Sequence, residues 1–161
     1  MSPEQVENLY VGPLDKTPSG QAISVVDFNN PDFERYPKFR EALKSAVTYE
    51  LEPSDAIFVP SMWWHHVESL SDFNLLVNYW WWSSPVYKGS PTTALMHAIL
   101  SVRDLPPRQR AAWRTIFDHY VFGADESVYE HIPEPGRGCL APLDEDGAKK
   151  LRAQIINLLN R

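Results

Sequence analysis

The sequence has one cysteine and a deficit of positive charge, and both features exclude classes of function. Cys139 alone cannot form an internal disulfide or a multi-cysteine metal site. Lys and Arg number 15 against 21 Asp and Glu, so the formal net charge of −6 disfavours a nucleic-acid partner. No apolar run approaches the roughly 18 residues of a membrane span, and no secretory leader opens the sequence. We therefore expect a soluble cytoplasmic protein that binds neither nucleic acid nor membrane.

Proline and tryptophan are unusually frequent in this chain. Its 161 residues correspond to one domain at roughly 150 residues per domain, and 43% hydrophobic with 22% charged residues is typical of a globular protein. The sequence holds 14 Pro and 6 Trp, and five of the six Trp lie between positions 63 and 82. This concentration of aromatic area indicates that a particular local structure is built there.

The first half of the chain has the pattern of short β-strands. Short apolar runs alternate with turn residues, as at 29–32 and 52–55, and one short helix is predicted at 39–44. Regularly spaced short strands favour a sandwich or barrel over a parallel α/β sheet. The predicted strands are 8–11, 22–28, 47–51, 56–59, 63–69 and 74–82.

The second half of the chain has the pattern of helices. Apolar residues recur at helical spacing over 92–102, 107–122 and 144–159, and the second stretch ends at Gly123 as a C-cap would. A Pro- and Gly-rich loop is predicted between the last two helices, and Cys139 within it is interpreted as an incidental thiol. The sequence thus predicts a mainly β fold followed by an α-helical tail.

One histidine stands out in the aromatic segment PSMWWHHVES at 60–69. Side chains alternate faces along a strand, so His65 shares a face with Trp63 and Val67. A desolvated, neutral imidazole among aromatic residues is well placed to bind a metal ion. A histidine on an aromatic strand is also commonly a packed, hydrogen-bonded residue, and the residues alone leave both interpretations open.

The same alternation defines two further groups of residues. His66 shares the opposite face with Trp64 and Glu68, and on the next predicted strand Asn78 shares a face with Trp80. The order His66-Val67-Glu68 is formally a His-x-Glu pair, for which His97, His119 or His131 could serve as a third ligand. We disfavour that site because the first two of these lie on predicted helices and the third in a Pro-rich loop.

Four ordered motifs resemble one family. They are 2–10 (SPEQVENLY), 26–39 with its VDFNNPD and YPKF elements, 60–69, and 77–80 (VNYW). Together they resemble the C-terminal half of the JmjC-type, cupin-like 2-oxoglutarate and Fe(II)-dependent oxygenases, a superfamily that includes the asparaginyl hydroxylase of hypoxia-inducible factor. Members of this superfamily convert O₂ and 2-oxoglutarate to succinate and CO₂ while they hydroxylate a protein or a small molecule.

The resemblance implies a fold and a set of site residues. It implies half of a cupin or jelly-roll double-stranded β-helix over 1–90, with core strands in 46–82, and a helical dimerisation region over 91–161. It implies that His65 is an iron ligand and that Asn78 and Trp80 lie near the iron and 2-oxoglutarate. It places His66 and Glu68 on the opposite face as framework residues.

Two of the three iron ligands expected of this family have no counterpart in the sequence. Non-haem Fe(II) oxygenases bind iron with two histidines and one carboxylate, and the family's first two ligands form a His-x-Asp/Glu pair well before the distal histidine. His65 is the first histidine of this chain. The resemblance therefore predicts that the chain begins after the fourth of eight barrel strands, without the N-terminal half and its ligands.

Three interpretations of the function follow from this. The chain is a piece of an oxygenase, a short non-catalytic cupin-like dimerisation or binding module, or an oligomer in which another subunit supplies the missing strands and ligands. Half a barrel leaves unpaired sheet edges and an uncovered apolar face. We therefore expect a homodimer formed through helices 91–161 and the exposed edges, since two-fold dimers are the commonest oligomers.

Overall fold

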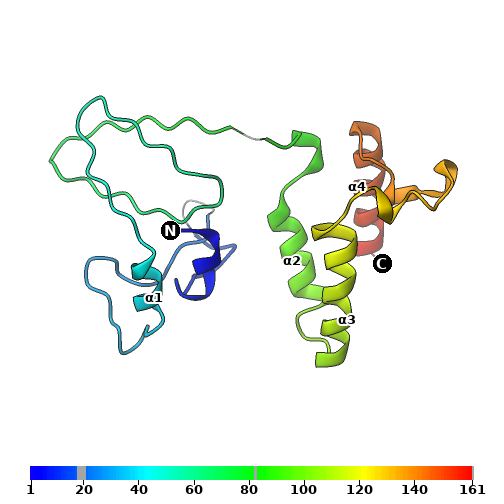
Figure 1. The fold of residues 1–161 in the computed structure, drawn as a ribbon, viewed down its shortest axis with the longest axis horizontal. Coiled ribbons are helices and arrows are strands. Elements are labelled where there is room, and N and C mark those ends of the chain that lie inside the picture. The colour runs from blue at the N-terminus through cyan, green and yellow to red at the C-terminus, as the bar shows by residue number, and fades with distance from the viewer. Residues whose placement is uncertain (18–20, 82, 161) are drawn as a thin grey trace. The chain divides into compact units, whose positions relative to one another are not determined.

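The computed structural model describes residues 1–17, 21–81 and 83–160, which form helices, turns and extended segments (Figure 1). The chain divides into two compact units, Met1–Leu76 and Val77–Arg161. Each unit is described by itself below.

The buried residues described in the first unit all lie within its first 45 residues, and Trp64 packs against them from the later segment. A 3-10 helix, η1 (Pro3–Glu7), and a short helix, α1 (Phe39–Lys44), flank a run of turns. The predicted helix at 39–44 is therefore confirmed. Phe39 is fully buried, and its ring meets that of Phe28 edge to face at 5.3 Å. The buried cluster consists of Leu9, Val26, Phe39 and Ala42.

Two turn segments of this core are joined by a single antiparallel bridge between Val11 and Ser24. The amide of Val25 donates to the carbonyl of Tyr10 at 3.1 Å, and the Ser24 hydroxyl donates to the carbonyl of Leu9 at 2.6 Å. Gly12 sits so close to the opposing segment that a Cβ there would meet Val25 Cγ1 at 2.9 Å. A side chain at position 12 would push these two segments apart.

The prediction of a mainly β fold is wrong for this structure. Among the described residues there is no β-strand, only the isolated Val11–Ser24 bridge. Residues 46–76 are extended coil, and so are the described residues of the last predicted strand, whose final residue, Trp82, lies outside the described part of the chain. The predicted strands 8–11, 22–28, 47–51, 56–59, 63–69 and 74–82 and the double-stranded β-helix are thus not formed.

The physical reason is that a strand needs a neighbour whereas a turn or a helix does not. A ladder satisfies main-chain groups only by pairing with another segment, and among the described residues no such ladder includes residues 46–76, although Trp64 exchanges main-chain hydrogen bonds with Met1. The turn predicted at 52–55 does form, with the Asp55 amide donating to the Glu52 carbonyl at 3.0 Å. The turn residues therefore fold as their own chemistry predicts, although the runs beside the turn do not form strands.

The second unit consists of helices, as its sequence predicts. The predicted stretch 92–102 corresponds to α2 (Pro91–Ser101), and 107–122 corresponds to α3 (Pro107–Phe117) continued by the π-helical turn η3 (Asp118–Phe122). The predicted 144–159 corresponds to α4 (Glu145–Leu159). Short 3-10 turns complete the unit: η2 (Val86–Lys88), η4 (Glu126–Val128), η5 (Glu134–Gly136) and η6 (Gly138–Leu140).

Local capping explains where these helices begin and end. Asp144 Oδ1 accepts from the Gly147 amide at 2.7 Å and the Ser90 hydroxyl accepts from the Thr92 amide at 3.2 Å, so both side chains satisfy amides that lack helical partners. At the end of η3, the Gly123 amide donates to the Asp118 carbonyl at 2.7 Å. None of the helices in the described part of the chain is long and apolar enough to cross a membrane.

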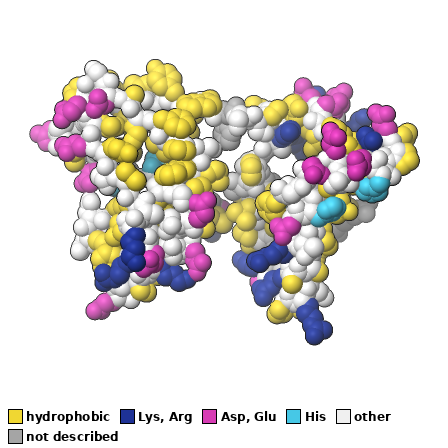
Figure 2. All heavy atoms as spheres, in the orientation of Figure 1, with side chains coloured by type: hydrophobic (Ala, Val, Ile, Leu, Met, Phe, Trp, Pro, Cys, Tyr) yellow, Lys and Arg dark blue, Asp and Glu magenta, His cyan; other side chains and the backbone are white. Residues whose placement is uncertain are grey.

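The second unit buries few side chains. Of its described hydrophobic residues only Val128 and Ala148 are buried, while apolar residues of α2, α3 and α4 stay accessible. In the first unit, most apolar side chains of 46–76 are likewise exposed, and Figure 2 shows hydrophobic side chains gathered on parts of the face in view. Large exposed apolar area of this kind is typical of surfaces that associate.

Candidate functional site

His65 lies directly after a tight turn in the first unit. The turn is closed by the Trp63 amide, which donates to the Pro60 carbonyl at 3.2 Å, and Met62 adopts a left-handed conformation with φ of 67°. The next residue, Trp64, exchanges both main-chain hydrogen bonds with Met1, each 3.0 Å long. These contacts fix the chain immediately before the position from which the imidazole projects.

The His65 ring makes one hydrogen bond, which fixes its tautomer. Its Nδ1 lies 3.0 Å from the carbonyl oxygen of Trp63. A carbonyl can only accept, so Nδ1 carries the hydrogen and Nε2 of the neutral ring keeps its lone pair. Metal-binding histidines commonly donate their second ring N–H to a carbonyl in this way. The His65 side chain is exposed, so its Nε2 is accessible.

The two residues of the His-x-Glu sequence make different contacts. The His66 ring is stacked on Phe28 at 5.2 Å with an interplanar angle of 2°, and Glu68 Oε1 accepts from Asn29 Nδ2 at 3.3 Å. Both side chains therefore reach the turn that begins with Asp27, whereas His65 does not. Residues 66 and 68 tie the extended segment to the core of the first unit.

The other two predicted site residues belong to the second unit, whereas His65 belongs to the first. Asn78 and Trp80 belong to the second unit, where both are in extended chain and exposed, Trp80 by 77%. The structure therefore does not bring His65, Asn78 and Trp80 together within one compact unit. The remaining histidines are dispersed as well, with His97 on α2, His119 on η3 and His131 in the loop that follows η4.

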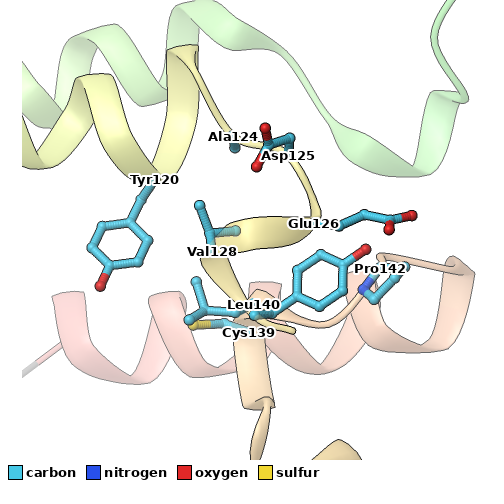
Figure 3. A pocket seen from close by; sticks show the side chains of 9 residues that line it. Tyr120, Ala124, Asp125, Glu126, Val128, Cys139, Leu140 and Pro142 are labelled. Carbon is cyan, nitrogen blue, oxygen red and sulfur yellow. The ribbon is translucent and has the colours of Figure 1, made fainter. Parts of the chain in front are cut away.

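A cavity of about 330 Å³ opens in the second unit between η3 and the 125–142 loop (Figure 3). Val128 and Leu140 form apolar lining, while Asp125 and Tyr129 add polar groups. The Ser127 hydroxyl and amide both donate to Asp125 Oδ1, at 2.6 and 2.9 Å, and these bonds hold the pKa of the Asp125 carboxyl below its usual range. The exposed Cys139 thiol also lines the cavity. No histidine is among the described residues that line the cavity with Cys139.

The sequence reasoning did not identify this cavity. It assigned 125–142 to a loop and Cys139 to an incidental thiol, and nothing in the spacing shows that η4, η6 and Tyr120 enclose a space. The available signal was weak: a loop of this length without secondary structure of its own is unusual in a compact domain.

Comparison with known proteins shows the family. The model of the cupin-like domain family matches residues 1–87, which is more than half of the chain. The chain is a member of the cupin-like domain family. This match extends across both the packed residues of the first unit and the extended segment that carries His65. No solved structure matches the chain.

The relatives of this cupin-like chain are JmjC-domain proteins. It is 40% identical over 80 residues to human HSPB1-associated protein 1, covering 48% of this chain and 15% of that protein. It is 41% identical over 80 residues to tRNA wybutosine-synthesizing protein 5 of Gallus gallus, covering 50% and 22%. Lysine-specific demethylase JMJ31 of Arabidopsis thaliana is 33% identical over 82 residues, covering 51% and 14%. The chain thus spans less than a quarter of each of these relatives.

The family generally depends on Fe(II) and 2-oxoglutarate, and the described residues can be tested for a fit to that iron. Non-haem iron sites of this kind need two histidines and a carboxylate around one metal position. No cluster of three or more His, Cys, Asp or Glu side chains occurs in the part of the chain that the structure describes. The described residues therefore do not supply two further ligands beside His65 for such an iron site.

Proposed function

We propose that this chain contributes to a JmjC-type, 2-oxoglutarate and Fe(II)-dependent oxygenase domain, in which His65 is one iron ligand. The observation that supports this most directly is the His65 Nδ1 contact with the Trp63 carbonyl at 3.0 Å, which leaves Nε2 available to a metal. The other two ligands come from outside these 161 residues, because no ligand cluster surrounds His65 among the described residues. Alone, the chain is not expected to bind iron tightly.

The role of the surrounding residues in this proposal is to position the imidazole. His66 on Phe28 and Glu68 on Asn29 hold this segment against the core, while the His65 ring stays exposed. We propose that Asn78 and Trp80 approach the iron and 2-oxoglutarate in the assembled domain. Substrate hydroxylation would then belong to the assembled domain. The scarcity of cysteine supports a reducing, cytoplasmic location.

The experiment is an anaerobic metal titration of the full chain followed by the imidazole NMR signals. Co(II), a paramagnetic stand-in for Fe(II), is expected to broaden the His65 signals first. The variant His65→Ala should remove this effect, and His66→Ala should keep it, because His66 is held on Phe28. Fe(II) with 2-oxoglutarate should give no charge-transfer band in the chain alone, since two ligands are lacking.

Two results would contradict the proposal. Broadening that persists in His65→Ala would show that another histidine binds the metal. A charge-transfer band that appears in the chain alone and survives the same substitution would show a site built from other residues.

The second candidate function is a non-catalytic association module in which helices 91–161 form a homodimer. It is favoured by the exposed apolar residues on three helices: Leu95, Met96 and Leu100 on α2, Trp113 and Ile116 on α3, and Ile155, Ile156, Leu158 and Leu159 on α4. Light scattering should then give a dimer mass at tens of micromolar, and Leu100→Glu should lower it. A monodisperse monomer at that concentration would exclude this candidate.

A further inference from the structure

Residues 75–80 form an exposed segment with an unusual composition. They read Leu-Leu-Val-Asn-Tyr-Trp, and no charged residue lies between Asp72 and Lys88. Leu, Val, Tyr and Trp side chains fill both strand faces, and proline and glycine are absent from the segment. Six-residue segments of high β-propensity, without charge or proline, are the type that pairs between chains.

The structure leaves this segment accessible along its whole length. The side chains of Leu75, Val77, Tyr79 and Trp80 are exposed by 83%, 63%, 83% and 77%. Within the described part of the chain, no hydrogen bond reaches the main chain of residues 75–80. The main-chain N–H and C=O groups of such an exposed, extended segment can form hydrogen bonds with a neighbouring strand.

The neighbouring extended segments are less suited to pair with copies of themselves. Residues 63–69 are tied to the core through Trp64, His66 and Glu68, which contact Met1, Phe28 and Asn29 respectively. Residues 47–55 carry three carboxylates, at Glu50, Glu52 and Asp55, and like charges repel when identical segments face each other. Residues 75–80 have neither an anchor nor a charge.

We propose that residues 75–80 form an intermolecular β-ladder with the same residues of a second copy of this chain. The absence of charge is what selects a second copy as the partner, because two identical neutral segments meet without like-charge repulsion and bury apolar side chains on both faces. This interaction involves neither the proposed iron ligand His65 nor helices 91–161. Because it uses Asn78 and Trp80, it is expected of the chain alone and not of the assembled domain of the proposed function. It adds main-chain hydrogen bonds that a helix–helix interface does not make.

The test compares two valine substitutions of nearly equal exposure in the full chain. Val77 is 63% exposed within the proposed ladder, and Val67 is 66% exposed outside it. Mass is measured by light scattering across a concentration series, and the intermolecular β-signal is measured by infrared spectroscopy on the same samples. As the concentration rises, the apparent mass of the parent chain and its intermolecular β-signal should increase together. Val77→Lys should raise the concentration at which the chain associates by about tenfold or more, since lysine on an edge blocks pairing.

The control Val67→Lys should associate like the parent. Neither valine is part of a buried core, and the helical circular dichroism of both variants should equal that of the parent. The proposal is overturned if the parent stays monomeric, if it associates without a β-signal, or if both lysine variants weaken association equally. The second of these results would assign association to the helices instead.

Discussion

Residues 1–45 and 46–76 belong to the same compact unit and to the same family match, yet the first segment is packed and the second is mostly exposed. The first segment holds all four buried side chains of that unit, while residues of the second are exposed or, in a few positions, half-buried. The second segment nevertheless has the stronger β-pattern. The difference teaches that strand propensity has no effect on structure until a second strand is present to receive its hydrogen bonds.

The packed segment succeeds because its contacts close short loops. The bridge between Val11 and Ser24 and the Phe28–Phe39 ring contact each join residues fewer than 15 positions apart. Such loops are inexpensive to close in conformational entropy. The extended segment instead depends on distant partners, and in the described part of the chain Trp64, His66 and Glu68 tether it to residues 1–3 and 28–29.

The largest expected effect comes from the same substitution made in both segments. Phe39→Ala removes a fully buried ring and should cost about 3–5 kcal/mol of unfolding free energy. Phe73→Ala removes a ring that is 84% exposed and should change stability by less than about 0.5 kcal/mol. Urea unfolding followed by the amide NMR signals of residues 1–45 measures both. Equal losses would show that the extended segment is packed after all.

A smaller effect is expected from a serine that joins the two sides of the core. The Ser24 hydroxyl donates to the Leu9 carbonyl at 2.6 Å and accepts from the Val26 amide at 3.1 Å. Ser24→Ala should cost about 1–2 kcal/mol, because a part-buried carbonyl and amide lose their partner. Ser69→Ala in the extended segment is the control, and the same unfolding experiment should find it close to the parent. If Ser24→Ala left the free energy of unfolding unchanged, the difference described between the two segments would be contradicted at this position.

The helices of the second unit are the opposite case to the extended segment, because their main-chain hydrogen bonds form within the helix and need no distant partner. Asp144→Ala removes the side chain that caps α4 and should cost about 1 kcal/mol. Asp146→Ala, two residues further along the chain, removes an exposed carboxylate that does not cap the helix, and it should lower the stability of α4 by less than Asp144→Ala does. Thermal loss of the helical circular dichroism signal measures both, and equal shifts would argue against the capping role.

The smallest expected effect is a pH dependence of the free energy of unfolding that arises from an ion pair in the packed segment. The ion pair with Lys38 lowers the pKa of Glu7 below its ordinary value of 4.5, and it raises that of Lys38. A lowered carboxylate pKa gives stability that is present above the unfolded pKa and is lost as the pH falls through the folded one. The raised lysine pKa gives stability that is present below its unfolded value and is lost as the pH rises through the folded one.

Acid titration of unfolding should therefore show a slight loss below about pH 4.5 that Glu7→Gln removes and added salt weakens. Both side chains are exposed, so the effect is small. Glu50→Gln in the extended segment should leave the slope unchanged. A slope that is the same in all three proteins would exclude a contribution from this pair.

Local determinants explain which features could be predicted from the sequence. The ends of α3–η3 and α4 follow from Gly123 and Asp144, and the 52–55 turn follows from its own residues. The strand assignments failed because pairing partners are not encoded in a segment's own pattern. The alternation of His65 and His66 was visible, but the stacking of His66 on Phe28 was not, since it joins residues 38 positions apart. The cavity beside Cys139 depends on how three separate turns pack.

Hydrogen exchange of the full chain in dilute solution tests the central claim most directly. Amides with structural partners in residues 1–45, such as those of Val25 and Phe39, and the interior amides of α2, α3 and α4 should exchange on the order of ten times or more slower than free peptide. Amides of residues 47–51 and 75–80 should exchange at the rate of free peptide. Protection of those two segments in a monomeric sample would contradict the account, because it would show that they pair within the chain.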